Sequence, residues 1–164
     1  SSILITPSQK LADEVKVEIE KWLLELPRQE IARKSIEERG AIIVTKTMEE
    51  AIYLMNQIAP EHLEVATNSP FELLPLIKHA GAIFLGHNTP EAIGDYVAGP
   101  NHTLPTGGTA KFYSPLGVEN FMKKTSIISF SKKGINEIGE ACALIANTEG
   151  LTAHEQSVRV RLDK

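Results

Sequence analysis

The chain has 164 residues, which fits a single folded domain and is long enough to bury a hydrophobic core. Hydrophobic residues make up 42% and charged residues 23% of the chain, so collagen-like, disordered and disulfide-scaffold classes are excluded. The net charge of -4 offers no excess of basic side chains for a phosphate backbone. We therefore expect no nucleic-acid partner.

The cysteine content and the hydropathy of the chain indicate the cellular compartment in which the protein is expected. The single cysteine, Cys142, cannot form an internal disulfide, and its place in an apolar helical pattern predicts a buried, inert thiol. We find no apolar run long enough to cross a bilayer and no signal-peptide pattern, so we expect no membrane partner and a cytoplasmic location. Because a strand-like run begins at residue 3 with no preceding cap, we expect the chain to be part of a longer protein.

The N-terminal part alternates between strand and helix patterns. A β-branched run at 3–6 predicts a strand, and Ser8 is a suitable N-cap for the amphipathic pattern that follows it. A second helical pattern covers 27–39 and stops at Gly40, where we expect a left-handed backbone conformation. Residues 41–44 predict the next strand.

The same alternation continues beyond that strand. Thr47 and Glu50 form a capping-box pattern for a helix that Pro60 ends. The segments after it are a strand at 63–66, a helix at 70–79 and a strand at 82–85. Strands separated by helices require parallel crossovers, with the helices packed on the sheet. The predicted fold class is therefore α/β, an open and mostly parallel sheet flanked by helices, similar to an incomplete Rossmann fold.

The regular pattern stops after residue 85. Glycines and prolines are dense as far as Pro115, and long irregular segments of this kind are usually functional or disordered. We favour a functional segment because it carries Glu91, Asp95 and His102.

Three more elements are expected towards the C-terminus: a strand at 125–130, a helix at 135–146 and an amphipathic helix at 151–162. We accordingly divide the chain into an α/β domain at 1–130 and a helical C-terminal extension at 131–164. We expect this extension to form a dimer contact.

Imidazole and carboxylate groups are the candidates for chemistry. Asp95, His102 and His154 have the oxygen and nitrogen donors that zinc binds, although their spacing is no short metal motif and each alone is more often structural. Glu61 and His62 are adjacent before a predicted strand, and they are either general bases or a solvated polar turn.

A glycine-containing segment at 106–111 resembles a phosphate-binding loop only weakly. Neither a P-loop nor a dinucleotide fingerprint is present in the sequence, so we assign no residue of this chain to a nicotinamide cofactor. Nucleotide binding through Gly107 and Gly108 is the least favoured of our hypotheses.

Three longer segments carry a resemblance to a known family. The segments APEHLE at 59–64, GDYVAGPNHTLPTGGTA at 94–110 and EGLTAH at 149–154 resemble histidinol dehydrogenase, and the likeness extends from Ile3 to near Arg161. The resemblance implies the family's activity, which is oxidation of L-histidinol through the bound aldehyde to L-histidine with two NAD molecules. It also implies a homodimer with one zinc ion at each active site and with the active site shared between subunits.

The resemblance also implies roles for individual residues. Asp95 and His154 match zinc ligands, with His154 reaching across from the partner subunit. Glu61 and His62 match the catalytic acid-base pair, in which His62 takes the alcohol proton and Glu61 activates a water molecule. The positions that match substrate-binding residues are Glu91, His102 and Glu149.

The resemblance places the family's two other zinc ligands, a Gln and a His, upstream of Ser1, together with most NAD contacts. Two ligands do not close a zinc site, so we expect the 164 residues alone to bind zinc weakly and to be inactive. The alternative is a non-catalytic dimerisation or ligand-binding module with the same fold. Retention of all the acid-base and metal candidates argues against that alternative.

Overall fold

The computed structural model describes residues 1–163. It forms two compact units, Ser1–Phe121 and a second unit that begins at Met122, and each is described by itself. None of the helices within residues 1–163 has the length and apolar character that a membrane span requires.

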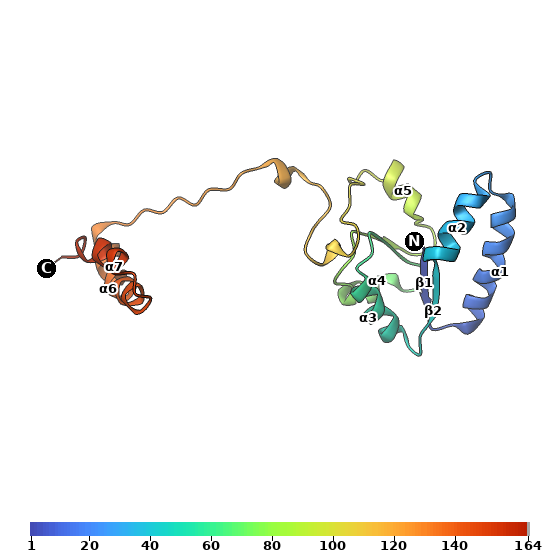
Figure 1. The fold of residues 1–164 in the computed structure, drawn as a ribbon, viewed down its shortest axis with the longest axis horizontal. Coiled ribbons are helices and arrows are strands. Elements are labelled where there is room, and N and C mark those ends of the chain that lie inside the picture. The colour runs from blue at the N-terminus through green and yellow to red at the C-terminus, as the bar shows by residue number, and fades with distance from the viewer. Residues whose placement is uncertain (164) are drawn as a thin grey trace. The chain divides into compact units, whose positions relative to one another are not determined.

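The first unit is built from two parallel pairs of short strands with helices between them (Figure 1). Strand β1 (Ile3–Thr6) pairs with β2 (Ala41–Val44), and β3 (His62–Val65) pairs with β4 (Ala82–Leu85). The predicted α/β class and the parallel pairing are confirmed. The strands form two separate pairs. The sequence could not predict this division, because periodicity identifies strands but carries no information on which strands become neighbours.

Helices α1 (Gln9–Glu25) and α2 (Gln29–Arg39) connect the first pair of strands, and α3 (Met48–Ile58) leads to the second. Helix α1 packs against both strands of the first pair and α3 packs against β1. Figure 1 shows the strand pair between these two helices.

The helix starts that the sequence predicts are confirmed. The Ser8 hydroxyl accepts a hydrogen bond from the Leu11 N–H at 3.2 Å. The Thr47 hydroxyl accepts one from the Glu50 N–H, also at 3.2 Å, while the Glu50 carboxylate reaches back to the Lys46 N–H at 2.8 Å. Together these bonds satisfy backbone donors that a helix N-terminus otherwise leaves free.

Gly40 ends α2 as expected, but the predicted left-handed conformation is wrong. Its φ of -78° and ψ of 151° are extended, a conformation that any residue adopts. A glycine is required here for a different reason, because a Cβ atom would lie 2.5 Å from the Ile36 carbonyl oxygen. The constraint is therefore close approach to the end of the helix.

The predicted helix at 70–79 is much shorter than expected. It consists of α4 (Pro70–Leu73) followed by a 3-10 turn at Leu74–Leu76. Pro75 lies in the middle of the expected segment, and its ring removes a backbone donor and clashes with a continuing helix.

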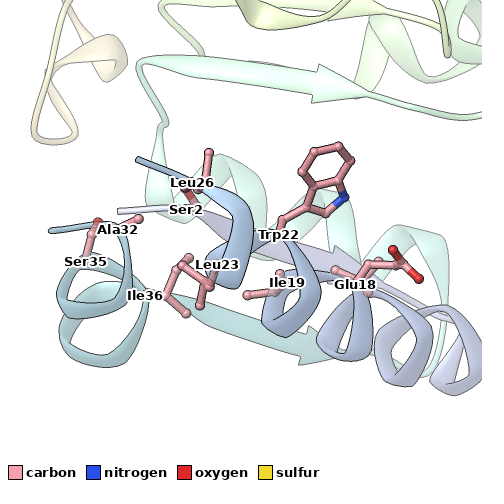
Figure 2. Close-up of a pocket in the computed structure, with 10 residues that line it drawn as sticks. Ser2, Glu18, Ile19, Trp22, Leu23, Leu26, Ala32, Ser35 and Ile36 are labelled. Carbon is pink, nitrogen blue, oxygen red and sulfur yellow. The ribbon is translucent and has the colours of Figure 1, made fainter. Parts of the chain in front are cut away.

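Trp22 and Leu23 of α1 and Ile36 of α2 help to line a shallow groove, and the Trp22 ring points away from Leu23 and Ile36 (Figure 2). Leu23 is buried in the core, whereas 61% of Trp22 is exposed.

The segment after β4 contains one short helix that the sequence did not predict, α5 (Glu91–Tyr96). Two 3-10 turns follow, at Thr109–Lys111 and Val118–Phe121. The remainder of this segment is irregular, as expected.

The second unit consists of α6 (Lys132–Thr148) and α7 (Thr152–Arg159), which confirms the expected helical extension. The strand predicted at 125–130 is wrong, since no strand forms there in the described chain. Ile127 and Ile128 are 93% and 80% exposed. A strand needs a hydrogen-bonded neighbour, and β propensity alone cannot provide one.

Cys142 is exposed, so the prediction of a buried thiol is wrong. Ala143, one residue further along α6, is fully buried. Successive residues of a helix are rotated by about 100°, so Cys142 lies away from the face that Ala143 buries.

We predict that Asn56→Ala destabilises the first unit. The Asn56 side chain donates to the Leu76 carbonyl at 2.9 Å and accepts from the Lys78 N–H at 2.7 Å and the His79 N–H at 3.2 Å. Because alanine removes these bonds, we expect a loss of about 1 kcal/mol in the free energy of unfolding, measured by urea denaturation. The matched control is Gln57→Ala at an exposed neighbouring position, and an equal loss in both variants would contradict the role of Asn56.

Candidate functional site

Helix α5 and strand β3 bring together an imidazole and two carboxylates. The Nε2 atom of His62 lies 3.6 Å from a carboxylate oxygen of Glu91 and 3.6 Å from one of Asp95. The ligand atoms of all three residues lie within 4.8 Å of one another. Glu91 and Asp95 are four residues apart, so a single helical face carries both carboxylates.

Close packing of α5 on the strands makes this arrangement possible. A Cβ atom on Gly94 would lie 2.5 Å from Cε1 of Phe84, so only glycine allows the helix to approach the buried ring this closely. The His62 ring also faces Phe84, with ring centroids 6.0 Å apart. At the start of the helix, the Glu91 N–H donates to the Glu64 carboxylate at 2.7 Å.

The electrostatics of the cluster favour an added positive charge. The pKa of Glu91 is raised, first because its carboxyl hydrogen-bonds to Asp95, and then by partial desolvation and by the negative charge of Asp95. Two carboxylates this close repel each other when both are ionised. A shared proton or a cation between them relieves that repulsion.

The donor set also fits a metal ion. The Nε2 atom of His62 is buried and, among the described residues, it has no hydrogen-bond partner although two carboxylates face it. Imidazole nitrogen and carboxylate oxygen are common zinc ligands. The cluster of His62, Glu91 and Asp95 therefore has suitable donors for a divalent cation, and Asp95 is the member that the sequence analysis expects to bind zinc.

Two further sequence candidates belong to the first unit. Glu61 directly precedes β3, and its carbonyl accepts from the Ala82 N–H at 2.8 Å, which fixes the backbone beside His62. His102 is exposed, and within the described structure it does not join the cluster of His62, Glu91 and Asp95.

The segment that resembles a phosphate loop forms a tight turn. Gly107 and Gly108 have φ values of 60° and 83°, and the Thr109 N–H closes the turn on the Thr106 carbonyl at 3.1 Å. Positive φ at both central residues is typical of a type I′ turn, which explains the two glycines by conformation.

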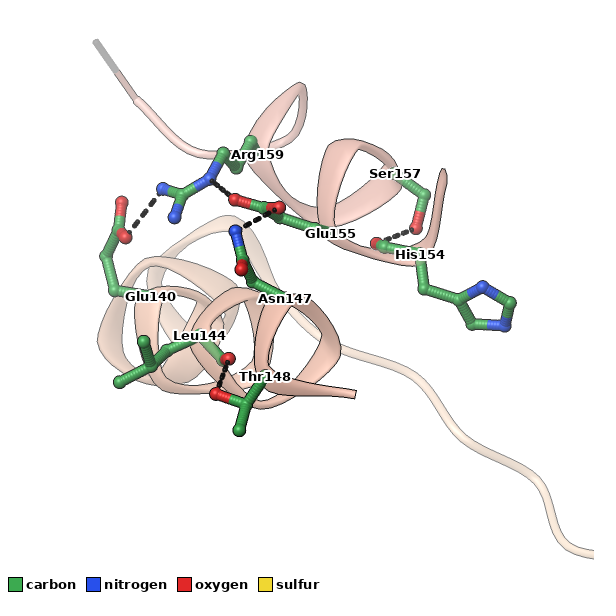
Figure 3. Close-up of polar contacts among 8 residues, drawn as sticks. All are labelled: Glu140, Leu144, Asn147, Thr148, His154, Glu155, Ser157 and Arg159. Atoms are coloured by element: carbon green, nitrogen blue, oxygen red, sulfur yellow. Dashed lines mark hydrogen bonds and ion pairs between the residues drawn. The ribbon is translucent and has the colours of Figure 1, made fainter. Parts of the chain in front are cut away.

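The remaining two candidates, Glu149 and His154, lie in the second unit. Glu149 is the exposed C-cap residue of α6, and His154 is in the first turn of α7. In Figure 3 the His154 imidazole points away from both helices, while its carbonyl oxygen accepts a hydrogen bond from the Ser157 hydroxyl at 2.7 Å. Its nitrogen atoms are therefore presented outward for contact.

A polar network fixes α7 on α6 beside His154 (Figure 3). The Glu155 carboxylate, in a residue that is only 8% exposed, accepts from Asn147 and from Arg159, each at 2.8 Å. Arg159 also donates to Glu140 at 2.8 Å. The hydrogen bond from Arg159 is the main cause of a lowered pKa for Glu155.

The structure thus assembles three of the seven sequence candidates, namely His62, Glu91 and Asp95, in one place. Glu64, which contacts the start of α5, was not identified from the sequence. The signal that could have indicated it is its position two residues after His62, because alternate residues of a strand lie on the same face.

The chain is thus an α/β protein that holds an imidazole and two carboxylates where α5 meets β3. These groups form a potential site for a divalent cation. Comparison with known proteins identifies the family. A family model described as histidinol dehydrogenase matches residues 1–162, so the chain belongs to the histidinol dehydrogenase family, as its motifs indicate.

Individual relatives agree with this assignment. A histidinol dehydrogenase of Sulfurimonas denitrificans is 85% identical over 164 residues, which are 100% of this chain and 38% of that protein. One from Wolinella succinogenes is 67% identical over 99% of this chain and 38% of its own length. The chain therefore spans about 38% of the length of these curated relatives.

The solved structures give the same result. The crystal structure of histidinol dehydrogenase from Elizabethkingia anophelis matches with a TM-score of 0.88 at 37% sequence identity. The match covers 97% of this chain and 36% of that chain.

We predict that acid weakens the attachment of α7 more in the wild type than in Glu155→Gln. The pKa of Glu155 is lower in the folded chain than its ordinary value of 4.5, so its ion pair stabilises the fold above that value. This stabilisation is lost as the pH falls through the lowered pKa. Hydrogen exchange of α7 amides, corrected for the intrinsic pH dependence, measures the effect.

The control for this experiment is Glu137→Gln, an exposed carboxylate of α6 that lies 3.9 Å from Lys133. Its pH dependence should match the wild type. A Glu155→Gln profile that also matches the wild type would refute the proposed contribution of the ion pair.

Proposed function

We propose that the protein containing this chain oxidises L-histidinol through L-histidinal to L-histidine, as an NAD-dependent, zinc-binding enzyme of histidine biosynthesis. The observation that carries the proposal is the cluster of His62, Glu91 and Asp95, within a chain that the histidinol dehydrogenase model matches over residues 1–162. Both support an acid-base and metal-dependent reaction. We further propose a cytoplasmic enzyme.

Asp95 is the proposed zinc ligand of the first unit, and His154 of the partner subunit is the proposed second ligand. When bound, zinc would hold the substrate in place and NAD would supply the hydride acceptor. No residue of this chain is assigned to NAD. The outward-facing imidazole of His154 supports a role in contacts beyond its own unit.

His62 is the proposed base for the alcohol proton. Its buried Nε2 atom faces the carboxylates of Glu91 and Asp95, each at 3.6 Å. An imidazole that has just gained a proton would form ion pairs with both, so the cluster stabilises the charge that proton removal creates. The position of His62 thus suits a group that accepts a proton during oxidation.

Glu61 is the proposed base for the second oxidation. An aldehyde must be hydrated before it can lose a hydride, and a carboxylate next to His62 can remove a proton from the attacking water molecule. The backbone bond between Glu61 and Ala82 supports a fixed position for this residue. The proposed substrate-binding residues are Glu91, His102 and Glu149, which offer charged or polar groups to the two ends of histidinol.

We propose that the enzyme is a homodimer with its active site shared between subunits, and that the helical extension at 131–164 forms part of the dimer contact. The exposed apolar side chains of Leu144, Ile145 and Val160 support a covered surface on this extension. We retain the α/β region at 1–130 as the part that carries the acid-base pair.

We predict that His62→Asn and Glu61→Gln affect different steps in a full-length enzyme that contains these residues. His62→Asn should slow oxidation of histidinol by roughly 10²- to 10⁴-fold, because it removes a general base. Glu61→Gln should retain the first hydride transfer and slow histidinal oxidation by a similar factor. NADH formation in single turnovers with either substrate measures both steps, with the exposed Glu72→Gln as the control.

Wild-type rates in both variants would overturn the assignment of the two bases. Absence of histidinol-dependent NADH formation in the wild-type full-length enzyme would overturn the proposed function itself and would favour a non-catalytic module.

We also predict that the 164 residues alone bind zinc weakly and do not reduce NAD. In the proposed assignment this chain contributes two zinc ligands, Asp95 and His154, because His62 serves as the base and Glu91 contacts the substrate. Catalytic zinc sites use three protein ligands. Zinc titration against a competing chelator and an NADH absorbance assay test this expectation. Robust histidinol-dependent NADH formation by the isolated chain would contradict it.

A further inference from the structure

Helix α5 cannot hold its own position. It has six residues, Glu91–Tyr96, and isolated helices of this length are unstable in water. Its N-cap residue is Pro90, which supplies no side-chain hydrogen bond to the first turn in the described structure. The Ile93 N–H bonds to the Pro90 carbonyl at 3.1 Å, so the N–H groups of Glu91 and Ala92 are the ones that depend on acceptors from elsewhere.

Strand β3 supplies one such acceptor. The Glu64 carboxylate accepts the Glu91 N–H at 2.7 Å across a separation of 27 residues. A carboxylate at a helix N-terminus also interacts favourably with the positive end of the helix dipole, and charge-assisted hydrogen bonds are stronger than neutral ones. Glu64 thus acts as a cap that comes from the sheet.

The same strand carries His62, the imidazole of the cluster. His62 and Glu64 are two residues apart, so both lie on the strand face that α5 covers. The partner of Glu64 in the strand register is Phe84, the residue against which Gly94 packs. One contact therefore fixes the start of α5 and a second fixes its middle.

The distance between the imidazole and the two carboxylates depends on these contacts. Glu91 donates its N–H to Glu64 and presents its carboxylate to His62, and Asp95 follows one turn later. If the start of α5 moved away from β3, both carboxylates would move away from the imidazole.

We propose that Glu64 is a positioning residue of this site: it caps α5 from strand β3 and so holds Glu91 and Asp95 at His62. Its importance for zinc binding and turnover rests on the proposed function. Glu64 itself needs no contact with substrate or metal, because its effect is transmitted through the helix.

The test compares Glu64→Ala with Glu64→Gln in a full-length histidinol dehydrogenase that contains these residues. Glutamine keeps an acceptor oxygen at the same reach, whereas alanine removes it. The matched control is Glu72→Ala, which removes an exposed carboxylate in α4 of the same unit.

Two measurements are made on each variant. Hydrogen exchange of the Glu91 amide reports whether α5 stays capped, and we expect roughly tenfold faster exchange in Glu64→Ala, with Glu64→Gln much nearer the wild type. Competition with a chelator reports affinity for zinc alone, and we expect a loss of roughly tenfold or more in Glu64→Ala, the usual effect of removing an outer-shell partner. Glu72→Ala should match the wild type in both.

The proposal is overturned if the Glu91 amide exchanges as in the wild type in Glu64→Ala, or if zinc affinity is unchanged while exchange accelerates. It is also overturned if glutamine restores neither property, because a cap needs only an acceptor. If Glu64→Ala does not fold, Glu64→Leu takes its place, because leucine keeps a bulky side chain at this position but has no acceptor oxygen.

A failure of the proposed function gives a different result. In that case the wild-type enzyme itself would show no zinc binding or no histidinol oxidation, whereas the exchange of the Glu91 amide would still show whether Glu64 holds α5.

Discussion

The packing of α5 against strands β3 and β4 is the interaction on which the site depends. This short helix carries Glu91 and Asp95, and it approaches the strands closely enough for both carboxylates to reach His62. The approach requires a glycine at position 94, because a larger residue would collide with the buried Phe84 ring. A small packing requirement in the core therefore sets the distances between groups that do chemistry.

The cluster combines groups that are unfavourable together unless a positive charge joins them. Two carboxylates are close enough for the pKa of Glu91 to rise, and an imidazole nitrogen nearby is buried without a hydrogen-bond partner in the described part of the chain. Functional sites commonly retain such unfavourable electrostatics, since a proton, a metal ion or a substrate supplies the positive charge when it binds. The proposed function uses this arrangement for a base that becomes charged while an alcohol is oxidised.

The second unit attaches a short helix, which carries His154, to a longer one. His154 lies on α7, a helix of eight residues, and the buried Glu155 carboxylate next to it holds this helix on α6 through Asn147 and Arg159. One residue of this short helix faces inward and supplies the attachment. Its neighbour faces outward and is free to take part in contacts with other groups (Figure 3).

The sequence is sufficient to identify the family, the α/β class and the starts of helices at Ser8 and Thr47, because local hydrogen bonding and periodicity are encoded over a few residues. Predictions from it were wrong for the backbone conformation of Gly40, the burial of Cys142, the helix broken at Pro75 and the strand expected at 125–130. All of these depend on neighbouring residues in space or on one overriding residue. The meeting of His62, Glu91 and Asp95 depends on tertiary packing, and so does the capping by Glu64 of the helix that carries two of them. Contacts between residues almost thirty positions apart depend on how a helix packs on a strand, and no local pattern contains that information.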